Sequence, residues 1–550
     1  MKKYNTLFVV GITILFVALL TWILPVTYLS GEFVEAERAQ AGIMNIFSYP
    51  IFTFYNFIYI FVYILAIGGI YGLLNKTSAY RLILDRVSNH VKKREIICLI
   101  LTVLLMSIIV SLTGFTFEAL LILPFIASIV LMLGYDKITA MMVTVGSISV
   151  GIIGTTFSSI VAGTFNEILS INYTDLIWVK VILLLICSAI LIVNIILHAR
   201  KIEKVKNPEE SFLIPSKVKE KSVKVWPLAT LLITSLVIIV VSSINWSEAF
   251  NITFFDILTE NILDSLVFSR YVVLTVSVLV VLYNILISVY KRKKEDKKDD
   301  KLMSKKRLIV TIIFGVFALL ALVKVMLVDV FKTTDIIEKA LEAIKLDGVI
   351  NAFTWGKLLG NVNPFGYWTY NDFVVLLLIL GLIIKFAYHI KFEDALDSYG
   401  DGLKRILYPA LVVLLGYTVL IITSSHPVML TILKPLLELT DGLSILWYPL
   451  CTLISALCNT DFNYYQYGVL SLTYATTYFT SSSVYPLCAL ITQTMYGFAL
   501  LIAPTSAVLL FSLSFLDIKY TTWLKKMWKL LLEFVLVIFI SYIIVLQFLV

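Results

Sequence analysis

Two polar interruptions of an otherwise apolar sequence carry the side chains that could do chemistry, one in each half of the chain. Both place hydroxyl groups near glycine or proline: Thr155, Thr156, Ser158 and Ser159 in the first, and Thr480, Ser481, Ser482, Ser483, Pro504, Thr505 and Ser506 in the second. Glycine and proline break helices and so free backbone N–H and C=O groups. Hydroxyls and half-helix N-termini beside a break can bind a carboxylate, and freed carbonyls can coordinate Na⁺. These residues are therefore the predicted substrate site.

Three further residues are candidates for binding a coupling ion. Glu118 lies in an apolar stretch between Gly114 and Pro124. A carboxyl group at membrane depth costs at least about 2.5 kcal/mol, so it is a functional candidate by default. It could accept a proton, bind a cation or cap a half-helix. The other two candidates, Asn459 and Asp461, lie in a polar segment that can also be a loop.

Helix packing is the alternative explanation for the hydroxyl clusters. Small residues and Ser/Thr also let membrane helices approach closely and bond to one another. For any single residue, packing explains the pattern as well as binding does. The occurrence of one interrupted region in each half favours binding, because such pairs are the best sequence indication of a secondary transporter's site.

The composition determines the class of protein. Of 550 residues, 60% are hydrophobic, and only 44 are basic and 36 acidic. Soluble domains have about 45–50% apolar and about 25% charged residues. The apolar residues come in runs of about 18–25, the length of a membrane-crossing helix, and they lack the alternation of β-barrel strands. Soluble, disordered and fibrous proteins and barrels are thereby excluded, and an all-α polytopic membrane protein is predicted.

About fifteen spans are expected, and three of them (116–134, 138–165 and 487–514) contain polar interruptions. Four basic connectors are predicted to be cytoplasmic by the positive-inside rule: Asn75–Glu95, Arg200–Lys224, Lys291–Arg307 and Lys519–Lys529. The net charge of +8 comes from such loops, so it marks topology and not a nucleic-acid partner.

The predicted organisation has three parts. Residues 1–198 form a first transmembrane repeat region, 199–307 linking helices with basic cytoplasmic loops, and 308–550 a second repeat region. Five cysteines lie in apolar runs without metal-ligand spacing, so they are interpreted as buried hydrophobic residues. No metal site and no catalytic residue is predicted.

The order of these signals resembles the YfcC-like membrane proteins, which are related to the anaerobic C4-dicarboxylate carriers of the ion transporter superfamily. The similarity runs over nearly the whole chain, and the segments that carry it include TGFTFEALLILPFIASIVLMLGYDK, GSISVGIIGTTFSSIVAGTF, SSSVYPLCALI and APTSAVLLFSLSFLDIKYTTWLKK. The resemblance implies two structural repeats, each with a re-entrant hairpin and an interrupted helix, and a scaffold domain beside a moving transport domain. It places Glu118 and Thr155–Ser159 in one half of the site, and Thr480–Ser483 with Pro504–Ser506 in the other.

Two classes of function fit the sequence. The first is an ion-coupled secondary transporter of a small carboxylate-bearing solute, a dicarboxylate or an amino acid, working by an elevator-type mechanism in a bacterial cell membrane. It needs no cofactor beyond a coupling ion, Na⁺ or H⁺, and its partners are the solute and the lipid bilayer, with a homodimer as one open assembly. The second is an integral-membrane enzyme acting on a lipid-linked substrate. The chain has only four histidines, which argues against the Arg/His clusters that such enzymes use for metal–phosphate chemistry.

Overall fold

The computed structural model describes residues 4–24, 26–29, 32–36, 40–158, 161–172, 174–205, 211–215, 224–242, 368–426, 447–458 and 482–549, with isolated residues at 432 and between 275 and 318. Contacts divide the chain into two compact units, Met1–Ile244 with Thr369–Val550, and Asn245–Trp368. The elements below belong to the first unit. This division does not test the predicted boundaries at 198 and 307, which stay predictions.

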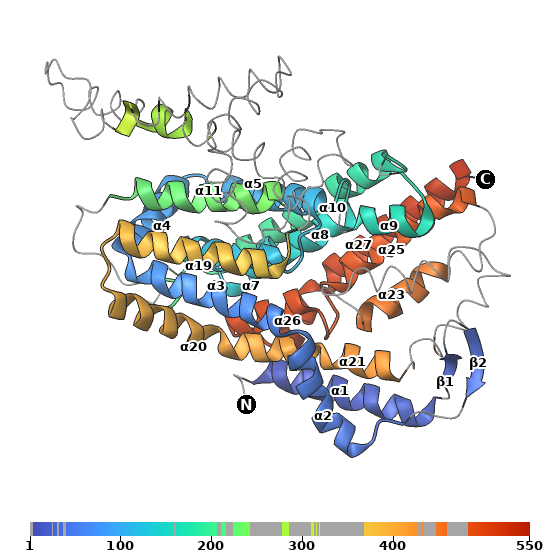
Figure 1. The fold of residues 1–550 in the computed structure, drawn as a ribbon. Coiled ribbons are helices and arrows are strands. Elements are labelled where there is room, and N and C mark those ends of the chain that lie inside the picture. Colours follow the sequence, from blue (N-terminus) through green and yellow to red (C-terminus); the bar gives the residue numbers. More distant parts are fainter. Residues whose placement is uncertain are drawn as a thin grey trace, which may run out of the picture. The chain divides into compact units, whose positions relative to one another are not determined.

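Helices dominate the described part of the first unit (Figure 1). Its N-terminal part contains α1 (Asn5–Ile23), α2 (Ile43–Asn56), α3 (Ile58–Lys76), α4 (Ser78–Val91), α5 (Glu95–Thr113), the 3₁₀ turn η1 (Glu118–Leu121), α6 (Leu123–Met132), α7 (Lys137–Met141), the π turn η2 (Met142–Gly146), α8 (Ser147–Ile153), α9 (Ala162–Leu169), α10 (Ile177–Lys201) and α11 (Trp226–Ser242). Its C-terminal part contains α19 (Tyr370–Ala387), α20 (Phe392–Gly416), α21 (Thr418–Ser425), α23 (Tyr448–Cys458), the 3₁₀ turn η5 (Ser482–Val484), α25 (Tyr485–Ala499), α26 (Ala507–Leu516) and α27 (Tyr520–Leu549).

Seven helices of the described part are long and apolar enough to cross a membrane. They are α1, α3, α5, α10, α19, α27 and the stretch Phe392–Ser425, which comprises α20 and α21. This finding confirms a multi-pass α-helical membrane protein. The repeats and their boundaries remain predictions, and the predicted spans 271–290, 308–328 and 467–485 lie largely outside the described residues.

The polar interruptions predicted within three spans are breaks in the helices of the structure. In 116–134, regular helix begins only at Leu123, after a loop and the turn η1. In 138–165, helix stops at Ile153 and resumes at Ala162, and 487–514 is divided between α25 and α26. The cause is local, because glycine, proline and hydroxyl residues disfavour continued helix at these points. Average hydropathy does not register such breaks.

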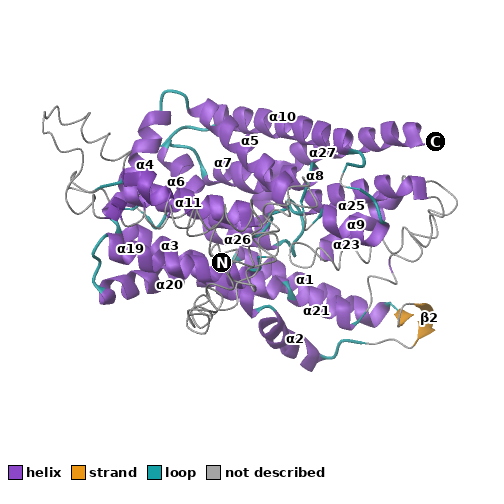
Figure 2. Cartoon of the chain, turned by 45° about the horizontal axis from the view of Figure 1, so that its top comes forward, coloured by secondary structure: helices purple, strands orange, loops and turns teal. Residues whose placement is uncertain are grey.

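A short β-hairpin is an exception to the all-α prediction (Figure 2). Strands β1 (Val26–Leu29) and β2 (Glu32–Ala36) follow α1 and pair antiparallel, with Tyr28 opposite Phe33. Its two strands bond to each other, which satisfies part of the backbone where the chain leaves α1.

Glycines bring α3 and α20 into close contact. A Cβ atom on Gly402 would lie 2.0 Å from the carbonyl oxygen of Gly68, and one on Gly72 would lie 2.2 Å from the carbonyl oxygen of Ser398. Small residues of this kind are the usual means by which membrane helices pack without a hydrophobic driving force. Because α19 also packs on α3, these three helices form one block, the α3 group.

A second block, the α8 group, comprises α5, α8, α10, α25 and α27. Here too a glycine allows close approach, since a Cβ on Gly151 would lie 2.5 Å from the Cβ of Val110 in α5. The indole of Trp523 in α27 is fully buried and donates to the carbonyl of Leu501 over 2.9 Å.

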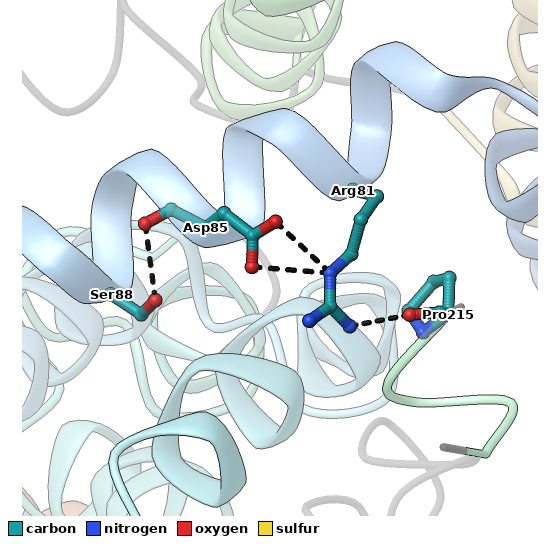
Figure 3. A network of polar contacts seen from close by, with 4 residues as sticks. All are labelled: Arg81, Asp85, Ser88 and Pro215. Carbon is teal, nitrogen blue, oxygen red and sulfur yellow. Dashed lines mark hydrogen bonds and ion pairs between the residues drawn. The ribbon is translucent and has the colours of Figure 1, made fainter. Parts of the chain in front are cut away.

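A segment of the predicted cytoplasmic connector, residues 211–215, is attached to α3 and α4. Arg81 in α4 is buried, pairs through Nε with Asp85 (3.1 Å), and donates from its guanidinium to the carbonyl of Pro215 (Figure 3). Asn75 donates to the carbonyl of Phe212 over 2.8 Å. The connector is therefore ordered here by side chains that satisfy its backbone.

The α3–α20 contact yields a stability prediction. Gly402→Ala should destabilise the protein by about 1–3 kcal/mol, because the new methyl group would overlap the backbone of Gly68. The matched control is Gly400→Ala in the same helix, where a Cβ meets no atom within 4 Å. Alanine should be neutral or stabilising there. The measurement is thermal unfolding of the detergent-purified variants, and equal melting of both would contradict the packing argument.

Candidate functional site

The first polar interruption begins with a chain reversal at the end of α5. Helix α5 is followed by Gly114, whose φ of +74° lies in the left-handed region that glycine tolerates. The chain then returns through η1 and α6. Tyr135, shortly after α6, donates from its hydroxyl to the carboxylate of Glu95 at the start of α5, over 3.0 Å. Both ends of this hairpin therefore lie together, and Glu118 lies at its tip.

Tyrosines from the α3 group surround Glu118. The hydroxyl of Tyr370 in α19 lies beside the Glu118 carboxylate. Tyr63 in α3 donates from its hydroxyl to the backbone carbonyl of Glu118 over 3.0 Å. Among the three rings here, Tyr63 lies 5.4 Å from Tyr370 and 5.8 Å from Phe117, measured between centroids. Glu118 forms no ion pair with another described residue. The hairpin tip thus contacts the α3 group through aromatic rings and one carboxyl group.

The break after α8 lies against the same hairpin tip, and hydroxyls satisfy its backbone. Ser111 in α5 donates to the carbonyl of Gly154 over 2.7 Å, and the backbone N–H of Thr156 donates to the carbonyl of Ser111 over 3.0 Å. Ser158 donates to the carbonyl of Thr113 over 3.1 Å. The break and the end of α5 therefore form one hydrogen-bonded unit.

The first predicted cluster is thus brought together by the structure. Thr155, Thr156 and Ser158 are buried, and Thr155 bonds back to the carbonyl of Gly151 in its own helix over 3.2 Å. Ser159 lies outside the described residues. These hydrogen bonds demonstrate a structural role for the hydroxyls, and their role in binding a substrate stays a prediction.

Gln493 in α25, which the sequence analysis missed, joins the two halves of the chain at this break. Its amide nitrogen donates to the carbonyls of Ile153 (3.0 Å) and Thr155 (3.2 Å), and its side chain is fully buried. Beside it, Ser149 in α8 donates to the carbonyl of Gly497 over 2.7 Å. A lone glutamine within the apolar run of α25 was the available signal, because an amide in hydrocarbon requires polar partners.

Lys180 in α10 is a second residue that the sequence analysis missed. It lies on the face that packs against the α8 break, one turn before Leu184, whose Cβ would lie 2.5 Å from a Cβ built on Gly154. Lysine side chains in a helix point towards its N-terminus, which here is towards the chain that follows Gly154. Lys180 is only 2% exposed and forms no hydrogen bond or ion pair with another described residue, although the carboxylate of Asp175, just before α10, acts on its charge from nearby. A buried cation beside a helix break is a candidate carboxylate ligand.

The second polar interruption separates α25 from α26. Ser506 caps α26, since its hydroxyl accepts from the N–H of Leu509 (3.3 Å) and donates to the carbonyl of Leu500 (3.2 Å). Thr505 donates to the carbonyl of Leu457 in α23 over 2.5 Å. Pro504, which directly precedes Thr505, is half-buried. The hydroxyls of Thr505 and Ser506 thus also hydrogen-bond to backbone groups that the break leaves without helical partners.

The structure does not gather the second predicted cluster at one point. Ser482 and Ser483 form the turn η5 before α25, whereas Thr505 follows its far end. A 15-residue helix between them is about 22 Å long. Thr480, Ser481, Asn459 and Asp461 lie outside the described residues, so their roles stay predictions. Within the described ranges, no three His, Cys, Asp or Glu side chains are grouped so that they could hold a metal ion.

Removing the Gln493 amide should weaken the joint between the two halves. Gln493→Leu keeps the side-chain size but leaves the carbonyls of Ile153 and Thr155 without their donor, at a cost of about 1–3 kcal/mol for each buried group. The control is Ser512→Ala in α26, which removes a buried hydroxyl without a hydrogen-bond partner among the described residues. In detergent, the melting temperature should fall for Gln493→Leu and stay unchanged for Ser512→Ala. If both variants melt like the parent protein, the amide does not hold the joint.

The family described as C4-dicarboxylate anaerobic carrier matches residues 5–262 and 481–548. The matched ranges contain the hairpin, the α8 break, Lys180 and Gln493. No curated protein and no solved structure matches the chain.

Proposed function

Because the chain belongs to the C4-dicarboxylate anaerobic carrier family, we propose that this multi-pass membrane protein moves a C4-dicarboxylate across the membrane, coupled to an ion gradient. The family is one of carriers, which points away from the membrane-enzyme alternative. It also favours a dicarboxylate over an amino acid, the other substrate class that the sequence left open. The proposal assigns separate roles to three parts of the chain: Lys180 at the α8 break, the predicted residues of the second half, and Glu118.

The observation that carries the proposal is the buried cation beside the α8 break. A dicarboxylate has two negative charges, and placing them in a membrane interior requires opposite charge and hydrogen-bond donors. Lys180 supplies the charge, and Thr156 and Ser158 supply hydroxyls at the same break. We assign Lys180 to one substrate carboxylate. The second carboxylate falls to the second-half residues predicted from the sequence.

Glu118 is the proposed coupling residue. It is the acid at the hairpin tip, and its described contacts there are hydroxyl, aromatic and backbone groups without a basic side chain. Because Tyr63 bonds to the Glu118 backbone, the carboxyl group can take up and release a proton, or hold a cation, without leaving its place. Protonation would reduce the charge that the hairpin presents to the α3 group. The coupling ion, H⁺ or Na⁺, is decided by the experiment below.

The two helix groups suit alternating access by movement of one block against the other. Gln493 and the close contact of Gly497 with α8 make the α8 group one body across both halves of the chain. The α3 group is held together by its glycine contacts. Between them lie the aromatic cluster at Glu118 and helix α26, which packs on α20. The interface consists largely of rings and apolar side chains, with one exposed ion pair, Arg405–Asp517 (3.6 Å), at the end of α26. Such an interface can slide at low cost, which supports the elevator-type mechanism as a proposal.

Substrate class is tested by uptake into liposomes that contain the purified protein. Radiolabelled succinate should accumulate, and unlabelled C4-dicarboxylates should compete better than C3 or C5 dicarboxylates, monocarboxylates or aspartate. Lys180→Met should reduce uptake at least about tenfold, because a charged contact contributes about 1.4 kcal/mol or more. Lys385→Met, which removes a lysine at the end of another spanning helix, is the control. Full uptake by the Lys180 variant would refute its role, and absence of any dicarboxylate uptake would refute the function.

Coupling is tested with Glu118→Gln, which keeps the size and polarity of the side chain beside Tyr370 but cannot ionise. We expect accumulation against a gradient to be lost while exchange of internal for external succinate continues. Varying Na⁺ at fixed pH, and pH at fixed Na⁺, in the parent protein identifies the ion. Glu393→Gln, which removes an exposed acid from the first turn of α20, is the control and should leave accumulation unchanged. If Glu118→Gln retains gradient-driven accumulation, Glu118 is a structural cap and coupling lies elsewhere.

A further inference from the structure

An apolar groove of about 520 Å³ runs between α5 and α6. Its α5 wall includes Leu101, Leu105 and Ile109, which are spaced by one helical turn and so share one face. Its α6 wall includes Phe125 and Ile129. Leu101 is 59% and Leu105 60% exposed, so in a membrane this groove faces hydrocarbon.

One end of the groove is basic. His90 and Arg94, at the junction of α4 and α5, line it and are exposed. Two neighbours, Lys92 and Lys93, add further charge. In the described part of the chain, the side chains of His90 and Arg94 have no hydrogen-bond or ion-pair partner. Arg81 on the same helix differs, because it is buried in contacts within the protein (Figure 3). The groove thus has charge available at its rim.

The depth of the groove matches one leaflet of a bilayer. From Arg94 to Ile109 a helix rises about 22 Å. One leaflet is about as thick when its headgroup layer is included, and about 15 Å of that thickness is hydrocarbon. The basic end belongs to a connector that the positive-inside rule assigns to the cytoplasm. The groove therefore starts at the level of the inner headgroups and ends near the middle of the membrane.

We propose that this groove binds an anionic phospholipid of the cytoplasmic leaflet. One acyl chain lies between α5 and α6, and the phosphate is held by Arg94, whose guanidinium can donate two parallel hydrogen bonds, with His90 beside it. The charge at the rim selects an anionic over a zwitterionic headgroup, since basic side chains at this level attract the negative inner surface.

A second apolar cavity offers room for the other acyl chain. It has a volume of about 350 Å³ and lies between α3, α4, α6, α11 and α19. Four side chains line both cavities: Val87, Ile122, Phe125 and Leu236. The two acyl chains of one lipid can therefore lie on opposite sides of these four side chains.

The bound lipid acts on the hairpin that carries Glu118. Ile122, which lines both cavities, directly follows the turn η1. Acyl chains in the two cavities would pack on α6 and support the returning arm of the hairpin. Occupancy should therefore raise the stability of the folded protein, because a ligand that binds only that state shifts its unfolding.

The experiment measures thermal unfolding of the full-length, detergent-purified protein during titration with phosphatidylglycerol or phosphatidylcholine. Phosphatidylglycerol should raise the melting temperature in a saturable manner, and phosphatidylcholine should not. Arg94→Gln should shift the titration midpoint about fivefold towards higher lipid concentration. The matched control is Arg86→Gln, which removes an equally exposed charge from α4 outside the groove and should leave the midpoint unchanged.

Ile129→Trp provides an independent test of the acyl-chain site, because the larger ring fills the groove without changing charge. It should abolish the phosphatidylglycerol shift even if it alters basal stability. Three outcomes would overturn the proposal. The first is an equal rise of the melting temperature with both lipids. The second is an equal weakening of phosphatidylglycerol binding by the Arg94 and Arg86 variants. The third is no change of the melting temperature with either lipid, as expected if another segment of this chain covers the groove.

Discussion

The fold depends on one constraint, which is that backbone groups freed inside a membrane must find partners within the protein. Each unpaired group costs several kcal/mol in hydrocarbon. Helix α8 stops at Ile153 with the chain still surrounded by helices. Its freed groups are paired by Ser111 from α5 and by the amide of Gln493 from α25. One break therefore requires contributions from both halves of the chain, and this requirement joins those halves into one block.

The same constraint separates side chains that maintain structure from those available for a solute. Thr155 and Ser158 already bond to backbone carbonyls, and Ser506 caps a helix. A solute that used them would have to offer the backbone an equivalent partner. Lys180 differs, because it forms no hydrogen bond with a described backbone group. Glu118 is intermediate, since its carboxylate lies beside backbone N–H groups at the start of η1 as well as beside Tyr370.

The sequence was sufficient for the class of protein and for the positions of the breaks, because both follow from local composition. It was insufficient for partners across the chain. Ser111 and Gly154 are 43 positions apart, and Gln493 and Ile153 are 340 apart, so helix packing alone brings them together. Hydropathy alone counts 487–514 as one span, and only its polar residues mark the division into two helices. Lys180 was overlooked within an apolar run because burial, which makes a lysine informative, is not visible in a sequence.

Glu118 lies where the two helix groups meet. The hairpin tip is bonded to the α8 break through Ser158, and its carboxylate faces the Tyr370 hydroxyl of the α3 group. In the proposed mechanism, movement of one group against the other separates the carboxylate from that hydroxyl. Protonation would change their attraction, because a charged acceptor bonds more tightly than a neutral one. The proposal also requires that the solute and Glu118 occupy the same rigid block, and Lys180, the proposed carboxylate ligand, lies in α10 of the α8 group.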